Sequence, residues 1–209
     1  MSNACIETIE DGKEKAGVYS YQMKRYELAI QHEFYFEAIV ISYAMIEDRL
    51  LAFLHYAGVI DRRICTQNNQ VKQKIRVCEQ AKKQINILLK NKESYTMNLD
   101  SISSKIRIIN ALMKLPEENN DPYLNLVRAQ IDKTIDREKF KTLFKELKTW
   151  LKPRDQIIHA LMNKRTNDVL ERQPNIAKDG YNIGRTLDGF VAKFKTGNKE
   201  GIRIAEKEK

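Results

Sequence analysis

Apolar residues recur along this chain at the three- and four-residue spacing of helices that bury one side. Four such stretches predict helices, over residues 18–33, 36–55, 101–115 and 124–134. A further apolar stripe extends from Phe140 to Leu151. It is followed by Pro153, which predicts a break and a new helix directly after it. These elements are typical of a helical bundle.

Glycine and proline are scarce over most of the chain. The sequence has 8 glycines and 4 prolines, and Gly58 is the only glycine between Gly17 and Gly180. Few turn formers beside many helix-forming residues predict an all-α fold, a bundle of about five to seven helices. Gly58 is expected to end the second helix, and Ser101 is expected to cap the helix that follows it.

The helical pattern weakens towards the C-terminus, where five of the eight glycines lie. We therefore divide the chain into three parts: a polar N-terminal lead (residues 1–17), a helical bundle (residues 18–165) and a basic, partly irregular C-terminal extension (residues 166–209). Within the extension, the pattern predicts a weak helix over residues 184–195 and then a mobile tail.

The cysteines and the hydropathy indicate the cellular setting. Cys5, Cys65 and Cys78 show no C-x-x-C pairing, so we expect reduced cysteines in the core and neither a zinc site nor a disulfide framework. The N-terminal residues are polar and acidic, unlike a signal peptide. The longest apolar run, residues 38–46, is too short to span a bilayer. We expect a soluble, cytoplasmic protein without a cofactor or a metal.

Positive charge is concentrated in one segment. The net charge is +9, and residues 62–92 hold nine basic residues against one acidic residue. The apolar spacing predicts a helix over residues 69–92, on which four basic residues fall within about 40° of one another: Lys72, Arg76, Lys83 and Lys90. A row of cations along a helix suits a nucleic-acid backbone, so we predict contact with RNA. The alternative is a charged face exposed to solvent.

The candidate chemistry lies in the stretch Arg154-Asp155-Gln156-Ile157-Ile158-His159. If a helix starts at Pro153, Arg154 and Asp155 occupy its first turn, where free backbone N–H groups and the arginine fork can bind a phosphate. Asp155 and His159 stand four residues apart, so the carboxylate can orient the imidazole. An arginine that binds a phosphate beside a histidine that moves protons is the minimum needed for phosphodiester chemistry.

Spacing alone is a weak signal, because an arginine and a histidine a few residues apart also occur together by chance. A second instance joins Arg49 to His55 inside a strongly apolar helix. The first instance differs in its context, with a proline before the arginine and a polar residue after it. The sequence has no carboxylate cluster of the kind that holds two metal ions and no Gly-rich phosphate loop, which disfavours metal nucleases and NTPases.

Glu47 interrupts the apolar stripe of the second helix, between Tyr43 and Leu50. A carboxylate is costly to bury unless it is paired or hydrogen-bonded. Two interpretations remain open. Glu47 forms a salt bridge with an arginine inside the bundle, or it supports the Arg154/His159 site from across the bundle. Both need a cationic partner, and Arg154 is a candidate for either.

In these features the chain resembles the HEPN domains of prokaryotic defence and toxin systems. Their hallmark is R-x4–6-H at the start of a late helix, usually with Asn, Asp or His directly after the arginine. Arg154, Asp155 and His159 match it, and the early helix with Glu47 is also similar. The resemblance covers roughly residues 18–165. Leu161 departs from it, because HEPN toxins paired with nucleotidyltransferase antitoxins usually carry tyrosine at that place.

The resemblance implies a metal-independent endoribonuclease with a defence or toxin role. Arg154 and His159 would be catalytic, Asp155 and Glu47 would support them, and attack by the 2′-hydroxyl would leave 2′,3′-cyclic phosphate ends. Family members commonly act as homodimers with one composite site. The expected partners are therefore RNA, a second copy and an antitoxin or other defence-operon protein. The alternative is a non-catalytic HEPN-like helical module that binds RNA, a nucleotide or a partner protein.

Overall fold

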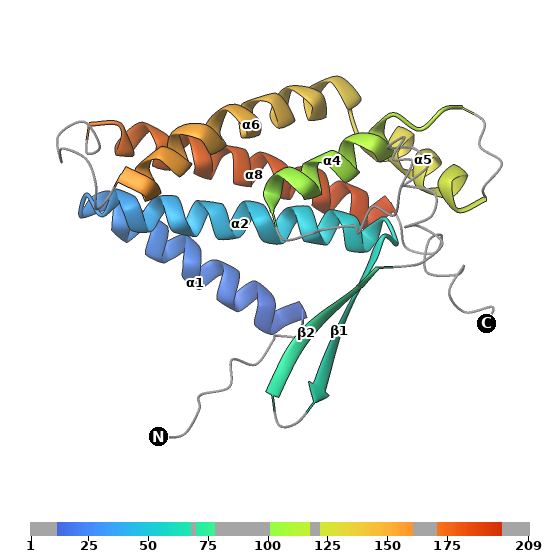
Figure 1. Ribbon diagram of the computed structural model, residues 1–209, viewed down its shortest axis with the longest axis horizontal. Coiled ribbons are helices and arrows are strands. Elements are labelled where there is room, and N and C mark those ends of the chain that lie inside the picture. The colour runs from blue at the N-terminus through green and yellow to red at the C-terminus, as the bar shows by residue number, and fades with distance from the viewer. Residues whose placement is uncertain (1–11, 68–69, 78–100, 118–121, 161–170, 198–209) are drawn as a thin grey trace.

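The computed structural model describes residues 12–67, 70–77, 101–117, 122–160 and 171–197. Within these residues six helices form a bundle (Figure 1): α1 (Gly12–Gln31), α2 (Tyr35–Tyr56), α4 (Ile102–Met113), α5 (Pro122–Thr134), α6 (Arg137–Ala160) and α8 (Gln173–Gly197). The prediction of an all-α helical bundle is confirmed. Two strands, β1 (Ile60–Gln67) and β2 (Gln70–Val77), add an antiparallel hairpin that projects from the end of α2 (Figure 1). No helix in these ranges is long and apolar enough to cross a membrane.

Helices α2 and α8 form the centre of the bundle and run side by side. Three contacts join them, in this order along both helices: Gly184 with Met45, Asp188 with Arg49 at 3.0 Å, and Phe194 with Phe53, whose ring centroids are 4.5 Å apart. Because the residue numbers rise together in the three pairs, the two helices point in the same direction.

Helix α8 also contacts α1, α5 and α6. Side chains of these helices donate hydrogen bonds to its backbone carbonyls: Tyr26 Oη to Ala177 at 3.2 Å, Trp150 Nε1 to Ile176 at 2.7 Å and Gln130 Nε2 to Phe194 at 2.9 Å. The helix expected over residues 184–195 is present, but it begins at Gln173 and its apolar side is buried. Residues 173–197 are therefore a core element of the bundle and not an extension of it.

Two glycines explain why this helix looked weak in the sequence. A Cβ atom on Gly180 would lie 2.5 Å from the ring of Trp150, and one on Gly184 would lie 2.0 Å from Cε of Met45. Only glycine leaves room for such close approaches. These residues suggest a helix breaker in the sequence, but in the structure they are the contact surface of a long helix.

Two of the predicted helix ends are confirmed. The side chain of Ser101 accepts a hydrogen bond at 3.0 Å from the backbone N–H of Ser104, which caps the start of α4. Gly58 follows α2 with φ of 69°, in the left-handed region that suits glycine, and the N–H of Val59 bonds the carbonyl of Leu54 at 2.9 Å. That bond closes the helix end.

The predicted helix over residues 69–92 is wrong for its first part, because residues 70–77 form strand β2. Val71 and Ile75 are four residues apart, which suggests a helix, but Val71, Ile75 and Val77 also fit the two-residue period of a strand. The ladder places Lys72 opposite Cys65 and Arg76 opposite Asp61. Lys72 and Arg76 therefore do not belong to a helical row of cations, and Lys83 and Lys90 lie outside the described residues.

The predicted break at Pro153 is also wrong. Helix α6 continues through Pro153 from Arg137 to Ala160. A proline inside a helix lacks the N–H that would bond the carbonyl four residues earlier, which typically costs about 3 kcal/mol. Trp150 and Ile157, buried on either side of Pro153, anchor α6 in the core and offset this loss. Arg154 and Asp155 therefore do not lie at a helix start, and no set of free N–H groups adds to a phosphate site there.

Candidate functional site

Arg154 is held between two helices. It lies on α6, and its guanidinium stacks on the ring of Tyr43 from α2, with Cζ 3.6 Å from the ring centroid. Its Nη1 bonds the carboxylate of Asp155 at 2.5 Å, and the side chain is 18% exposed. Its Nε is buried and has no hydrogen-bond partner among the described residues. Arg154 is therefore fixed in place, and one of its donors is buried without a partner among the described residues.

Tyr43 lies between Arg154 and a second charged pair. Burial raises the pKa of the Tyr43 hydroxyl, and the negative charge of Glu47 raises this pKa further, while the positive charge of Arg154 lowers it. Tyr43 and Glu47 stand four residues apart on α2, so they share one face of that helix. The phenol stays protonated well above neutral pH and acts as a neutral, aromatic support for the guanidinium.

Glu47 pairs with a lysine and not with the expected arginine. Its Oε1 accepts a hydrogen bond at 2.8 Å from Nζ of Lys105, a residue of α4 that is only 1% exposed. The Glu47 side chain remains about one-third exposed. The pair supplies the partner that a carboxylate in an apolar stripe requires, and it brings α4 to the same face of α2 as Arg154.

Five residues from three helices thus form one polar cluster, the α2–α4–α6 cluster: Tyr43, Glu47, Lys105, Arg154 and Asp155. It brings together three of the four residues predicted for the chemistry. The fourth, His159, lies in the last turn of α6, four positions after Asp155, and its side chain is outside the described part of the structure. Asp155 is about half exposed, so the cluster reaches the surface.

Sequence reasoning missed Tyr43 and Lys105. Lys105 carried a signal, because it lies in the apolar stripe that Ile102, Ile106 and Ile109 form on α4, and all three are buried. A lysine there needs an anionic partner for the same reason that Glu47 needs a cationic one. Tyr43 carried only the weaker signal of an aromatic residue one helical turn before Glu47.

The second arginine–histidine pair has a different environment. Arg49 bonds Asp48 and Asp188, and its guanidinium lies over the ring of Tyr19, 5.0 Å from the centroid. Burial raises the pKa of Tyr19, and the negative charge of Asp188 adds to this rise. His55 contacts the carbonyl of Ile60 at 3.2 Å through Nδ1. These contacts tie α1, α2, α8 and the hairpin together, so this pair is part of the packing.

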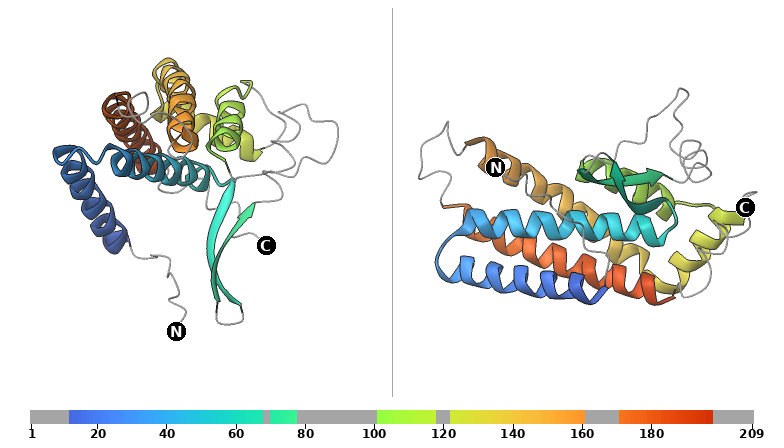
Figure 2. Two further views of the ribbon diagram at one scale, coloured as in Figure 1. Left: turned by 60° about the vertical axis from the view of Figure 1, so that its left-hand side comes forward. Right: turned by 90° about the horizontal axis from the view of Figure 1, so that it is seen from below.

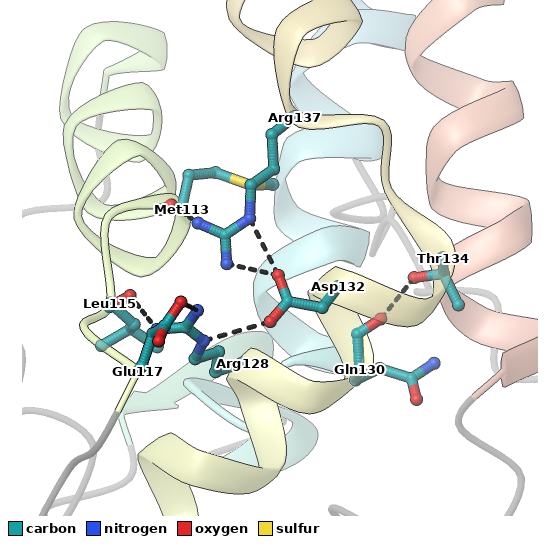
Figure 3. A network of polar contacts seen from close by, with 8 residues as sticks. All are labelled: Met113, Leu115, Glu117, Arg128, Gln130, Asp132, Thr134 and Arg137. Atoms are coloured by element: carbon teal, nitrogen blue, oxygen red, sulfur yellow. Dashed lines mark hydrogen bonds and ion pairs between the residues drawn. The ribbon is translucent and has the colours of Figure 1, made fainter.

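A third polar network joins α4 to α5 and α6 (Figure 3). Asp132 accepts hydrogen bonds from Arg128 and Arg137, whose guanidinium groups also bond the carbonyls of Leu115 and Met113 at the end of α4. Partial burial acts to raise the pKa of Asp132, but the hydrogen bonds from the two arginines outweigh it and lower that pKa. Because each arginine closes a helix end, this network has a structural role.

No family model, no curated protein and no solved structure matches this chain.

Proposed function

We propose that the protein is a metal-independent endoribonuclease of the HEPN type, in which Arg154 binds the scissile phosphate and His159 transfers protons. The observation that carries the proposal is the fixed guanidinium of Arg154. It is stacked on Tyr43, largely buried, and left with an unpartnered Nε beside a cluster that reaches the surface. A guanidinium held in one orientation can stabilise charge that develops on a phosphate oxygen without reorganising.

The proposed chemistry uses the substrate's own nucleophile. The ribose 2′-oxygen attacks the adjacent phosphorus while a base removes its proton, the bond from phosphorus to the 5′-oxygen breaks, and an acid protonates that leaving oxygen. A 2′,3′-cyclic phosphate and a free 5′-hydroxyl result. An imidazole titrates near neutral pH, so His159 suits either proton transfer. In this scheme Asp155 neutralises Arg154 before the phosphate binds.

The hairpin supports a route for the RNA. It carries five of the nine basic residues of the segment 62–92: Arg62, Arg63, Lys72, Lys74 and Arg76. A ribbon with this charge attracts a phosphate backbone. We therefore extend the proposal to RNA contact by Lys72 and Arg76 on β2, and by Lys83 and Lys90 after it. Each lost phosphate contact should reduce the salt dependence of binding by roughly one unit of slope.

The proposal includes a homodimer in which Arg154 and His159 of both protomers face one composite site, and a role in defence or as a toxin that an antitoxin or other operon partner restrains. These parts rest on the resemblance to the HEPN domains. They predict that inactive and active protomers mixed in one dimer cleave RNA more slowly than the parent dimer.

One observation favours a second candidate function. Arg154 already has a carboxylate and an aromatic ring as partners, and this arrangement also suits a purely structural arginine. The protein would then be a non-catalytic HEPN-like module that binds RNA, a nucleotide or a partner protein. In that case Arg154→Ala would lower the free energy of unfolding and would change no rate of RNA cleavage.

The deciding experiment measures cleavage of end-labelled single-stranded RNA in the presence of a chelator. We expect the parent to cleave, His159→Ala to abolish cleavage and Arg154→Ala to impair it by about 10²-fold or more, the typical loss of one transition-state contact. Mass spectrometry should find 2′,3′-cyclic phosphate ends, and DNA should not be cleaved. His32→Ala is the matched control, because His32 is exposed in the turn after α1 and its removal should leave the rate unchanged.

Circular dichroism should show that the three variants fold as the parent does. Cleavage by His159→Ala at the rate of the parent, or activity that requires a divalent metal, would contradict the proposed mechanism. RNA binding without cleavage by the parent would favour the binding module.

A further inference from the structure

The two faces of the β1–β2 hairpin differ in composition. Residues directly opposite one another in an antiparallel ladder share a face, and every second residue of a strand belongs to the same face. The pairing runs without a bulge from Ile60 opposite Val77 to Gln67 opposite Gln70, so each face keeps its residues along the whole ladder. One face, the apolar face, holds five isoleucines and valines: Ile60, Ile64, Val71, Ile75 and Val77. The other, the cationic face, holds four basic residues: Arg63, Lys72, Lys74 and Arg76.

The positive charge of the hairpin is therefore concentrated on one side. Arg62 is the only basic residue at a position of the apolar face, and Asp61, opposite Arg76, is the only acidic residue in the two strands. The apolar face meets the bundle at the base of the hairpin, where Ile60 is buried. Beyond this base the hairpin extends away from the helices (Figure 2, left). The cationic face thus belongs to an arm that stands apart from the bundle.

The register also places two like charges directly opposite each other. Arg63 is the partner of Lys74 in the ladder. Like charges at directly opposite positions destabilise a sheet, and a two-stranded hairpin has little stability of its own to offset this repulsion. An anion bound between the two positions would remove the repulsion. The pair therefore indicates an anionic ligand for the cationic face.

The cations of β2 have a spacing that suits a nucleic-acid backbone. Lys72, Lys74 and Arg76 occupy alternate positions, so their Cα atoms follow one another at about 6.8 Å, or about 3.4 Å per residue. Successive phosphates of an extended single strand are separated by the backbone of one nucleotide, which spans a similar length. Double-stranded RNA suits the arm less well, because its major groove is deep and narrow.

We infer that the cationic face binds the phosphodiester backbone of single-stranded RNA over three successive phosphates. Lys72 and Arg76 bind the outer two phosphates. Lys74 and Arg63 together bind the middle one. This contact rests on the RNA binding of the proposed function, to which it adds Arg63 and Lys74 and from which it excludes Arg62. Phosphate contacts do not involve the ribose 2′-hydroxyl, so single-stranded DNA should bind to the same face.

An anionic membrane fits the same charges less well. An amphipathic element at a membrane surface buries its apolar face among the lipids. In this hairpin the cationic face lies on the opposite side from the apolar face. Burial of the apolar face would therefore turn the four cations away from the lipid headgroups.

Fluorescence anisotropy of a labelled oligodeoxythymidine tests the cationic face in the full chain, because the proposed nuclease cannot cleave this probe. For single strands, the logarithm of the binding constant falls with the logarithm of the salt concentration by about 0.7 per phosphate contact. Arg63→Gln with Lys74→Gln removes the middle contact and should reduce this slope by about 0.7, and adding Lys72→Gln should double the reduction. Arg62→Gln is the matched control, since it removes a charge from the neighbouring position of β1 on the other face. It should leave the slope unchanged.

Acetylation of the parent tests the same contacts without any variant. The bound probe should protect Lys72 and Lys74 from acetylation, as mass spectrometry would show. Lys139 is the control, because its side chain is 78% exposed on α6 and should react equally with and without the probe. Equal acetylation of Lys72 and Lys74 in both samples would overturn the inferred contact.

The remaining outcomes separate this contact from the proposed nuclease. Circular dichroism should show that the glutamine variants fold as the parent does. A slope reduced as much by Arg62→Gln as by Arg63→Gln/Lys74→Gln would overturn the assignment of the face, and so would binding to phosphatidylserine vesicles without binding to the probe. A parent that binds the probe through the cationic face but cleaves no RNA would count against the nuclease alone. Cleavage of RNA by a parent whose slope the glutamine substitutions leave unchanged would count against the cationic face alone.

Discussion

Lys105 shows how one residue constrains its surroundings. Its ammonium group is almost fully buried among the isoleucines of α4, and it bonds Glu47, which is about one-third exposed. The two partners therefore depend on the pair unequally. Without Lys105, Glu47 can bind water, whereas without Glu47 a buried ammonium loses its carboxylate, which typically costs about 3–5 kcal/mol.

This asymmetry predicts the effects of two substitutions. Glu47→Ala should lower the free energy of unfolding by about 3 kcal/mol, and Lys105→Met should change it by less than about 1.5 kcal/mol, since methionine fills a similar apolar space. Urea denaturation measures both values. Glu146→Ala, at an exposed position on α6, should have almost no effect. A larger loss for Lys105→Met than for Glu47→Ala would contradict this account of the pair.

Tyr26 predicts an alkaline limit to stability. Its hydroxyl bonds the carbonyl of Ala177, and its ring stacks on Tyr181 with centroids 4.3 Å apart. Burial raises the pKa of Tyr26 to about 12, with a smaller contribution from Tyr181. Because this pKa is raised above that of an unfolded tyrosine, near 10, the stabilisation is complete below about pH 10 and is lost as the pH rises towards 12.

The variant Tyr26→Phe isolates this effect. It should lower the free energy of unfolding by about 1 kcal/mol at pH 8, through loss of the hydrogen bond. Above pH 10 its stability should fall less steeply than that of the parent, because phenylalanine does not ionise. Urea denaturation at a series of pH values measures both slopes. Parallel slopes for the two proteins would show that Tyr26 does not set the alkaline limit.

At the scale of single residues, the sequence showed that Glu47 must have a cationic partner, but it did not show which residue that partner is. A glutamate in an apolar stripe must find a cation, and this follows from desolvation alone. Which cation it finds depends on how α4 packs on α2, because Lys105 is 58 residues away in the chain. Arg154, one candidate for that partner, lies beside the same face of α2 but stacks on Tyr43.

At the scale of elements, the glycines of α8 do not all follow the ordinary rule for glycine in a helix. Replacing glycine by alanine inside a helix usually stabilises it by about 1 kcal/mol. Gly189 should follow this rule, since nothing lies within 4 Å of a Cβ atom there. Gly180 should not, because a Cβ atom would lie 2.5 Å from a Trp150 ring whose Nε1 is bound to Ile176.

Thermal and urea unfolding of the two variants should therefore differ in sign. We expect Gly189→Ala to raise the free energy of unfolding by about 0.5–1 kcal/mol and Gly180→Ala to lower it by about 1–3 kcal/mol, the usual cost of overpacking a core. Gly184→Ala should fall between them, because the atoms it meets belong to the flexible side chain of Met45. Stabilisation by Gly180→Ala would show that α6 and α8 do not meet as closely as described.

Pro153 and Val71 show why two elements could not be predicted. A proline fits both the first turn of a helix and an interior position that neighbours hold in place, and only the burial of Trp150 and Ile157 decides between them. Val71 and Ile75 fit both a helical and a strand period. The pairing of β1 with β2 decides the second case, through backbone hydrogen bonds that no local pattern reveals.

At the scale of the whole molecule, α8 is the element on which the others converge. It contacts α1, α2, α5 and α6, and the side chains of Ala177, Leu187 and Phe194 are fully buried. Without it, α2 would lose its central partner, and a large apolar surface would meet water at a cost of about 25 cal/mol per Å².

Truncation of the chain tests whether α8 is a core element of the bundle. A chain that ends at residue 165 should lose cooperative unfolding and expose apolar surface, which dye binding and circular dichroism would detect. A chain that ends at residue 197 retains α8 and is the matched control. We expect it to unfold cooperatively. If the chain ending at 165 unfolded like the control, residues 18–165 would form an independent bundle and α8 would be an appendage after all.

What the sequence determined by itself is what depends on near neighbours: the all-α class, most helix faces, the serine cap at α4, the glycine end of α2 and the stretch that carries Arg154, Asp155 and His159. These depend on apolar spacing and on backbone preferences within a few residues. What only the tertiary structure decided is which elements meet. Contacts between distant segments placed α8 in the core, paired Glu47 with Lys105, stacked Arg154 on Tyr43 and carried α6 through Pro153.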